Sequence, residues 1–526
     1  MRDFHRPGRS TVHAERGLCA TSHPLAAMVA VDILRQGGNA VDAAIAAAVL
    51  LGFCEPQMTG IGGDCFALVS PTPESDPVAL NGSGRAPMAL DAERLRGAGH
   101  RRMPVEGATA VTIPGAVAGF AALSERFGRL GLAASLAPAI DYAEAGVPVA
   151  PRVAFDWADG ASHLQGAARR YFLKDGAPLR VGDVFRAPEQ ADVLRAIAER
   201  GPAAFYEGAI AQDMVAALKA AGGCHEEADF ARCRADWGQP IRGQYRGTEV
   251  LEHPPNGQGA VALLMLQMLE AFDVESLDPL GADRVELEAG IARLAYDARN
   301  RLLADPDAMA DPGALHDPAL AAELVAKLDR SAVPAGIRSH THASHRDTVL
   351  VTVVDRDRMA VSLIYSIFNE FGSGVACERH GILFHNRGAG FSLEPGHPNE
   401  AGPGKRPMHT ILPGLLRRDG RTLMPFGVMG GQFQPTGHMR LISNMIDFGM
   451  DLQEAIDAPR SFAFDGELRL ERGYPPAVHV ELERRGHRVV IPPDALGGAQ
   501  AILFDSETGL LIGASDPRKD GIALGY

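Results

Sequence analysis

Thr348 is the residue whose position most directly suggests chemistry. It separates a polar stretch, 338–347, from the β-branched run 349–354, so it would open a buried strand. If the chain were cut between Asp347 and Thr348, the new α-amine would lie beside the threonine hydroxyl. Such an amine titrates at about pH 8, so at neutral pH part of it can accept the hydroxyl proton. One residue would then supply both nucleophile and base. Without a cut, Thr348 is simply a good strand-forming residue.

Two glycines follow a second apolar run and could complete such a site. Gly430 and Gly431 come directly after the stretch 426–429. The backbone amides of adjacent glycines can point at one spot, as stabilisation of an oxyanion requires. The alternative is an ordinary turn between a strand and a helix.

Arginines in glycine-rich loops could recognise a carboxylate. Arg85 and Arg387 both lie in such loops, and a guanidinium group binds a carboxylate through two parallel hydrogen bonds. The alternative for each is a surface arginine.

The histidines His340, His342 and His345 could attract a metal, but they lie in a polar stretch without a matching set of carboxylates. We therefore predict no metal and no other cofactor.

Composition limits the classes of partner. The chain has 526 residues, 46% of them hydrophobic, and a formal charge of −14, which argues against nucleic acid or an anionic membrane as the main partner. The loop 60–63 lacks the full spacing of a dinucleotide-binding motif. No apolar leader is visible at the N-terminus, and the six cysteines are scattered without a Cys-x-x-Cys pair. We expect a cytoplasmic protein without membrane or nucleic-acid partners.

The elements that must position these residues are mixed helices and strands. Helices are expected at about 39–51, 117–127, 137–145, 188–199, 209–221, 260–272, 283–303, 320–328, 437–448 and 452–458. Strands are expected at about 65–69, 78–80, 247–252, 349–354, 359–365, 381–384, 410–416 and 422–426, and around His479, Val489 and Ile502. Buried runs of both kinds predict stacked sheets covered by helices.

Taken together, the motifs resemble the γ-glutamyltransferase family of N-terminal nucleophile hydrolases. The resemblance covers nearly the whole chain and includes the segments 37–44, 60–63, 114–119, 205–208, 371–374, 458–460 and 514–518. It implies an α+β fold, a four-layer αββα sandwich. It also implies self-cleavage before a threonine, giving a large chain, 1–347, and a small chain, 348–526. The two chains would form one intertwined domain and a heterodimer, with further pairing left open.

The resemblance also assigns roles to the catalytic positions. Thr348 falls at the family's nucleophile, so the cut is expected after Asp347. Gly430 and Gly431 match the oxyanion-hole glycines. A hydroxyl near the nucleophile is retained at Ser366.

The substrate positions depart from the family pattern. The arginine that holds the glutamyl α-carboxylate falls opposite Ser83, with Arg85 two residues further on, and the serine pair maps near Arg406. The acceptors for the substrate's α-amine fall at Phe368 and Gly390. Arg387 replaces a glutamine in the same region.

At these positions the chain lacks the groups that would accept hydrogen bonds from a substrate ammonium, and it has gained an arginine. This change indicates a substrate with a carboxylate and no α-amine. Phe368 also takes up space, which indicates a small substrate. The motifs are most similar to those of the oxamate amidohydrolase branch, which converts oxamate to oxalate and ammonia. Expected substrate-binding residues are Arg85, Ser366, Arg387 and Arg406. One alternative is glutathione hydrolysis or γ-glutamyl transfer. Another is an uncleaved binding protein that keeps the fold without the chemistry.

Overall fold

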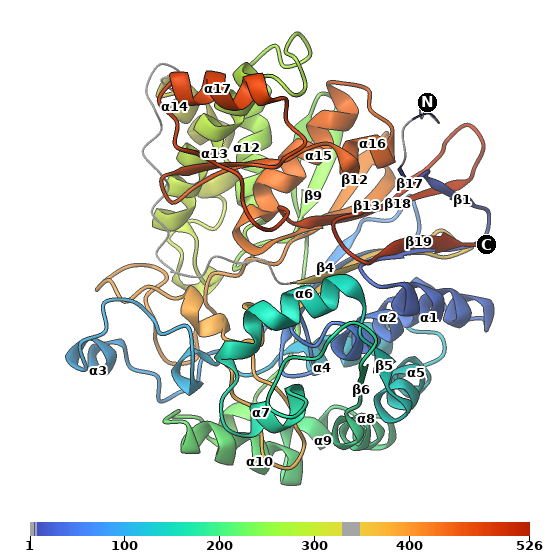
Figure 1. The fold of residues 1–526 in the computed structure, drawn as a ribbon, viewed down its shortest axis with the longest axis vertical. Helices are drawn as coiled ribbons and strands as arrows, with labels where there is room; N and C mark the ends of the chain where they lie inside the picture. Colours follow the sequence, from blue (N-terminus) through green and yellow to red (C-terminus); the bar gives the residue numbers. More distant parts are fainter. Residues whose placement is uncertain (1–4, 6–7, 329–347) are drawn as a thin grey trace.

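Two antiparallel sheets of seven strands each lie at the centre of the computed structural model, with helices on both outer sides (Figure 1). The structure describes residues 5, 8–328 and 348–526. The predicted α+β fold with four αββα layers is confirmed by this arrangement.

The sheet that carries Thr348 is called the Thr348 sheet. Its strands, in spatial order, are β19 (Ile522–Gly525), β2 (Leu18–Thr21), β10 (Val349–Val354), β11 (Ala360–Ser366), β3 (Asp64–Ser70), β4 (Val78–Gly82) and β7 (Asp236–Gly238). The second sheet is called the Gly430 sheet because its strand β13 ends beside that glycine. Its order is β1 (Val12–Ala14), β18 (Leu511–Ser515), β17 (Gly498–Phe504), β13 (Arg421–Met429), β12 (Pro413–Arg418), β9 (Thr248–Glu252) and β8 (Ile241–Tyr245).

The two sheets pack face to face through small apolar clusters. One cluster contains Phe66, Leu350, Ile364, Ile411 and Met429. Because side chains alternate along a strand, Val349, Val351 and Val353 point to the opposite face of β10 and join the core beneath the helices. The β-branched run after Thr348 is therefore buried on both faces, as a central strand requires.

Each outer face is covered by its own set of helices. Against the Thr348 sheet lie α1 (Pro24–Arg35), α2 (Ala40–Cys54), α4 (Ala116–Phe127), α5 (Leu132–Ala145), α6 (Pro151–Gly160), α8 (Pro188–Arg200) and α10 (Gly208–Ala220). Against the Gly430 sheet lie α12 (Gly259–Leu269), α13 (Ala282–Leu302), α15 (Gln434–Ile446) and α16 (Leu452–Asp457). Asn39 is the N-cap of α2, and its side chain accepts hydrogen bonds from the backbone of Val41 and Asp42.

The remaining elements are short. They are α3 (Ala92–Gly97), α7 (Ala167–Phe172), α9 (Ala203–Tyr206), α11 (Glu227–Ala231), α14 (Pro318–Ala326), α17 (Pro476–Arg484), β5 (Val147–Pro148), β6 (Val184–Phe185), β14 (Ser461–Phe464), β15 (Glu467–Leu470) and β16 (Val489–Val490).

Both sheets combine strands from either side of the expected cut. In the Thr348 sheet, β10 pairs with β2 on one edge and with β11 on the other. In the Gly430 sheet, β12 pairs with β9, which precedes residue 348. Segments 1–347 and 348–526 are thus woven into one unit.

Two predicted strands were wrong. The segment around His479 is the helix α17, because Val478 and Leu482, four residues apart, pack on one face while Pro476 opens the first turn. The stretch 381–384 contributes only an isolated bridge between Ala376 and Leu383. The histidines at 340–345 lie outside the described residues.

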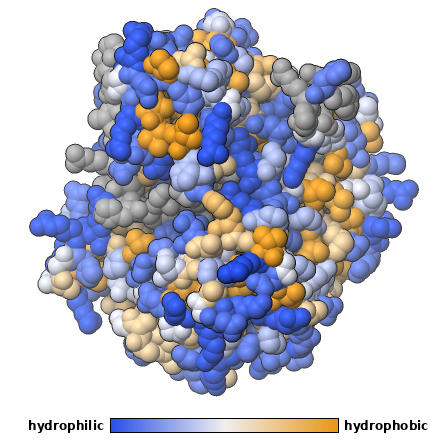
Figure 2. Space-filling view, viewed as in Figure 1, coloured by the Kyte–Doolittle hydropathy of each residue, from blue (hydrophilic) through white to orange (hydrophobic). Residues whose placement is uncertain are grey.

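The face of the molecule in Figure 2 is mostly hydrophilic, with apolar residues in small groups. Within the described part of the chain, no helix combines the length and the apolar character that a membrane crossing needs. All six cysteines are free thiols.

Candidate active site

Thr348 lies at the entrance of strand β10 and is buried, with 1% of its surface exposed. The pairing of Val349 with Tyr365 brings it beside the end of β11. There its hydroxyl donates a hydrogen bond to Ser366 Oγ at 3.4 Å, and Ser366 Oγ also accepts the Phe368 N–H at 2.8 Å. The predicted neighbours Thr348 and Ser366 are thus together, whereas Asp347 lies outside the described residues.

Arg387 is fully buried close to this pair. Its guanidinium lies 3.9 Å above the centre of the Phe368 ring, and Nη1 donates to Thr410 Oγ1 at 2.9 Å. Among residues 8–328 and 348–526, neither Nε nor Nη2 finds a hydrogen-bond partner. Burial lowers the pKa of Arg387 to about 9, against the opposing charge of Asp64, so the group remains a cation at neutral pH. An unsatisfied buried cation is costly to fold and calls for an anionic ligand.

Asp64 supports Arg387 but has little capacity left for another partner. Oδ1 accepts the backbone N–H groups of Gly84 at 3.2 Å and Gly115 at 3.1 Å. Oδ2 lies 3.2 Å from His409 Nε2 and 3.9 Å from Arg387 Nε. Burial opposes the charge, but His385, His409 and Arg387 together lower the pKa of Asp64 to about 2. Asp64 is therefore a fixed anion that orients its neighbours.

Gly430 and Gly431 form a sharp turn between β13 and α15. Both have left-handed backbone torsions, with φ of 119° and 54°, which glycine adopts without strain. The Gly430 carbonyl accepts the Phe433 N–H at 2.9 Å, and this bond fixes the plane that carries the Gly431 N–H. Gln258 Nε2 donates both to Gly431 O at 3.0 Å and to Thr410 O at 2.7 Å. The glycine turn is thereby tied to the residue that holds Arg387.

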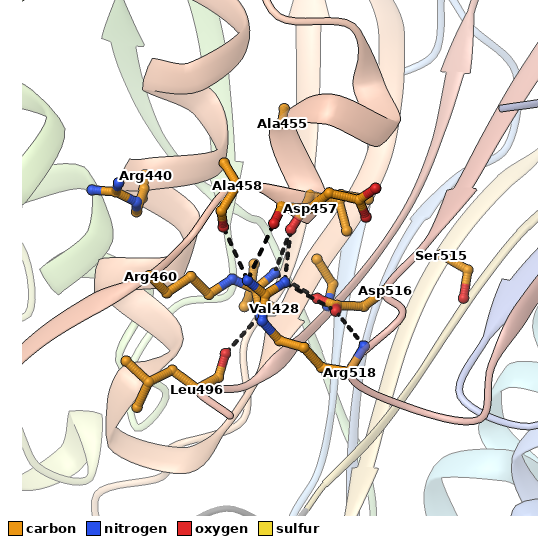
Figure 3. Close-up of polar contacts among 12 residues, drawn as sticks. Val428, Arg440, Ala455, Asp457, Ala458, Arg460, Leu496, Ser515, Asp516 and Arg518 are labelled. Atoms are coloured by element: carbon orange, nitrogen blue, oxygen red, sulfur yellow. Dashed lines mark hydrogen bonds and ion pairs between the residues drawn. The ribbon is translucent and has the colours of Figure 1, made fainter. Parts of the chain in front are cut away.

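The far side of the turn is backed by Gly497. A Cβ built on Gly430 would lie 2.9 Å from the Gly497 Cα, so the two backbones are in contact. A buried ionic cluster holds the Gly497 segment in place (Figure 3). Arg460 Nη1 donates to Leu496 O at 2.6 Å, and Asp516 Oδ2 accepts both the Ala499 N–H at 2.8 Å and Arg460 Nη2 at 2.5 Å.

A second support lies beneath strand β13. The His438 Nε2 atom accepts the Val428 N–H at 3.2 Å, and His438 Nδ1 lies 2.8 Å from Glu252 Oε1. Because Nε2 accepts, the proton lies between Nδ1 and the carboxylate, and His438 is held in one orientation. Sequence reasoning missed this pair, since Glu252 and His438 come together only when β9 and α15 pack.

Replacing Gly497 by alanine is expected to lower kcat by about 10²-fold with little change in KM, because the new methyl would lie 2.3 Å from Met429 O and displace the glycine turn. Steady-state kinetics measures this. Gly509→Ala is the matched control, since Gly509 has a similar φ of 75° and open space around it. Equal loss in both variants would contradict the expectation.

Arg85 and Arg406 lie in a separate outer cavity of about 260 Å³. Arg85 Nη1 is 3.2 Å from Asp305 Oδ2, and its side chain is 42% exposed. Arg406 donates to Ser83 O at 2.9 Å and forms an ion pair with Asp236. Both guanidiniums donate hydrogen bonds to acidic side chains, whereas the Asp64 carboxylate lies 3.9 Å from Arg387 Nε.

The two stacked antiparallel sheets between layers of helices have the fold of the N-terminal nucleophile hydrolases. The family profile of gamma-glutamyltranspeptidase matches residues 26–526, and the chain belongs to that family. It is an enzyme of a family of amide hydrolases and acyl transferases.

Curated relatives match along almost their full length. The glutathione hydrolase-like YwrD proenzyme of Bacillus subtilis is 35% identical over 98% of this chain and 99% of its own. The oxamate amidohydrolase proenzyme of Klebsiella pneumoniae is 35% identical over 97% of this chain and 98% of its own. The crystal structure of cephalosporin acylase from Bacillus halodurans superimposes with a TM-score of 0.92 at 38% identity, covering 100% and 99% of the two chains.

Proposed function

We propose that this protein is a self-cleaving threonine amidohydrolase that acts on a small amide bearing a carboxylate, with oxamate as the favoured substrate. Thr348 would be the nucleophile. Arg387 would hold the carboxylate, and Gly430 and Gly431 would stabilise the oxyanion. The observation that carries the proposal is the buried Arg387, two of whose donors are unpartnered within the part of the chain that the structure describes.

The first step would be cleavage of the chain itself. The Thr348 hydroxyl attacks the carbonyl carbon of Asp347, the Asp347–Thr348 amide bond breaks, and the amine leaves with a proton. Water then hydrolyses the resulting ester, which separates the two chains and frees the Thr348 hydroxyl beside the α-amine released in the first step. The hydrogen bond from Thr348 to Ser366 fixes the direction of the hydroxyl.

The same hydroxyl would then attack the substrate amide. The freed α-amine takes the hydroxyl proton and passes it to the leaving nitrogen, so ammonia departs and an oxalyl ester remains on Thr348. Water attacks this ester in the second half, and oxalate is released. In both halves the negative oxygen of the tetrahedral state lies toward the amides of Gly430 and Gly431.

The surroundings of Arg387 support a substrate without an α-amine. The Nε and Nη2 donors face the same side of the guanidinium fork and match the two oxygens of one carboxylate. The Asp64 carboxylate already receives two backbone amides and His409, so it has little capacity left for a substrate ammonium. The Phe368 ring fills the space under Arg387. A γ-glutamyl group would bring an ammonium that these contacts leave unpaired.

Substrate comparison tests the proposal. The kcat/KM for oxamate is expected to exceed that for a γ-glutamyl anilide by at least about 10²-fold, since an unpaired buried ammonium costs several kcal/mol. Longer monoamides of dicarboxylic acids, malonamate and glutaramate, should fall between them. A preference for the γ-glutamyl anilide would support glutathione hydrolysis or γ-glutamyl transfer instead.

The remaining alternative is an uncleaved binding protein. A denaturing gel distinguishes it, because two bands at the masses of 1–347 and 348–526 support the enzyme and a single band supports the binding protein.

The six free thiols are typical of a reducing compartment, and we infer a cytoplasmic location.

A further inference from the structure

We propose that Asp213, Cys377 and His380 form a binding site for a single divalent transition-metal ion of the Zn²⁺ type. The three residues lie away from the candidate active site, on helix α10 and the turn 377–381. Their ligand atoms (a carboxylate oxygen, the thiol sulfur and an imidazole nitrogen) all lie within 4.8 Å of one another. This set is the usual mixture for zinc, whose ligands are thiolate, imidazole and carboxylate.

The turn that carries Cys377 and His380 has the form of a metal-binding knuckle. The two ligands are three residues apart, and Gly381 follows in the left-handed region with φ of 63°. The Ile382 N–H donates to the Cys377 sulfur at 3.3 Å. Two more backbone amides, those of Arg379 and His380, donate to Asp213 Oδ2 at 3.0 and 3.2 Å. These two bonds occupy Oδ2 and fix the direction of the carboxylate, so Oδ1 would be the oxygen that binds the metal.

The distances are close to those that a metal requires. His380 Nδ1 and Asp213 Oδ2 are 2.7 Å apart. A tetrahedral zinc, with bonds of about 2.0 Å to nitrogen or oxygen and about 2.3 Å to sulfur, separates its ligands by roughly 3.2–3.7 Å. His380 Nδ1 and the Asp213 carboxylate must therefore separate slightly to take a metal between them. His380 is one-fifth exposed, so water can reach the fourth position.

The charges of the ligands and the metal ion would also balance at this site. Asp213 and Cys377 are buried, and a thiolate, a carboxylate and a dication sum to zero. Binding requires the thiol proton to leave and the imidazole proton to move to Nε2, which frees Nδ1 for the metal. Arg379 Nε lies 3.5 Å from Asp213 Oδ1, but its side chain is 61% exposed and can turn to solvent.

The site would connect the two parts of the chain. Asp213 belongs to the large part, whereas Cys377 and His380 belong to the small part that begins at Thr348. A metal bound here would therefore hold the two chains together after cleavage. The sequence did not indicate this, because Asp213 lies 167 residues from His380.

Cobalt(II) binding to the processed, tag-free protein tests the proposal. Wild type, stripped with a chelator, should take up one Co²⁺ per molecule and develop the near-ultraviolet thiolate-to-cobalt band, and Zn²⁺ should displace it. Cys377→Ser should lose the band, and Asp213→Asn and His380→Gln should weaken binding at least about tenfold. Zinc should raise the unfolding temperature of wild type but not of His380→Gln.

Matched controls separate this site from other ligands. Cys224→Ser removes a thiol outside the site, and His163→Gln removes a histidine paired with Glu106 at 2.8 Å. Both should keep the full cobalt band, as should a variant with His340, His342 and His345 replaced by glutamine. Absence of stoichiometric metal in wild type, or a thiolate band that survives Cys377→Ser, would overturn the proposal. If Cys377→Ser does not fold, the zinc-dependent unfolding of His380→Gln decides.

Discussion

Thr348→Ala is expected to leave the protein as one polypeptide of 55.7 kDa and to abolish amide hydrolysis. The substitution removes the hydroxyl that would break the chain and attack the substrate, so both events should stop together. Loss of a nucleophile lowers kcat by about 10⁴-fold or more. A denaturing gel and mass spectrometry measure cleavage, and ammonia release measures turnover.

Two further variants make this result specific. Thr348→Ser keeps a hydroxyl and should retain slow cleavage and measurable turnover. Thr352→Val removes a buried hydroxyl from the same strand, one that donates to Ala20 O at 3.2 Å, and should be cleaved normally. Full activity in an intact Thr348→Ala chain would refute the proposed chemistry.

Arg387→Met is expected to lower kcat/KM for oxamate by roughly 10²- to 10³-fold, since a buried charge–carboxylate contact is worth about 3–5 kcal/mol when one partner is removed. Methionine keeps much of the apolar stem that packs near Phe368. The loss should depend on the substrate's charge. Pyruvamide, in which a methyl group replaces one carboxylate oxygen, should be hydrolysed about equally by wild type and variant.

Arg85→Met is the matched comparison for the outer cavity. Arg85 is partly exposed and paired with Asp305, so its removal should change kcat/KM by less than about threefold. A larger loss in Arg85→Met than in Arg387→Met would place the substrate carboxylate in the outer cavity.

Local sequence patterns predicted many of the helices and strands. The strand after Thr348 was predicted at its observed bounds, because five apolar residues and a threonine, nearly all β-branched, are typical of a central strand. The helices predicted at 260–272 and 283–303 occur as 259–269 and 282–302. Long runs that are apolar, or that repeat with the helical period, favour a helix over other structures. The helix predicted at 437–448 begins earlier, at Gln434, because the glycine turn leads directly into it.

Other features depend on contacts that no local pattern records. The short strand Leu18–Thr21 was not predicted, and its place beside β10 is set by tertiary packing. Tertiary packing also sets the role of Asp64, which the sequence places at the end of a glycine loop but which lies between His409, Arg387 and two backbone amides. The sequence predicted three arginines that could bind the substrate carboxylate. Only packing shows that Arg85 and Arg406 form hydrogen-bonded ion pairs, whereas the nearest carboxylate oxygen to Arg387 Nε lies 3.9 Å away.

Because each sheet contains strands from both segments, cleavage should change the kinetics of refolding. Before cleavage, β2 and β10 belong to one molecule, so their meeting during folding is unimolecular. After cleavage the same pairing would join two molecules, and recovery from denaturant would become second order. Diluting the unfolded mature enzyme should therefore slow its renaturation, whereas the uncut Thr348→Ala chain should regain structure at a rate independent of dilution.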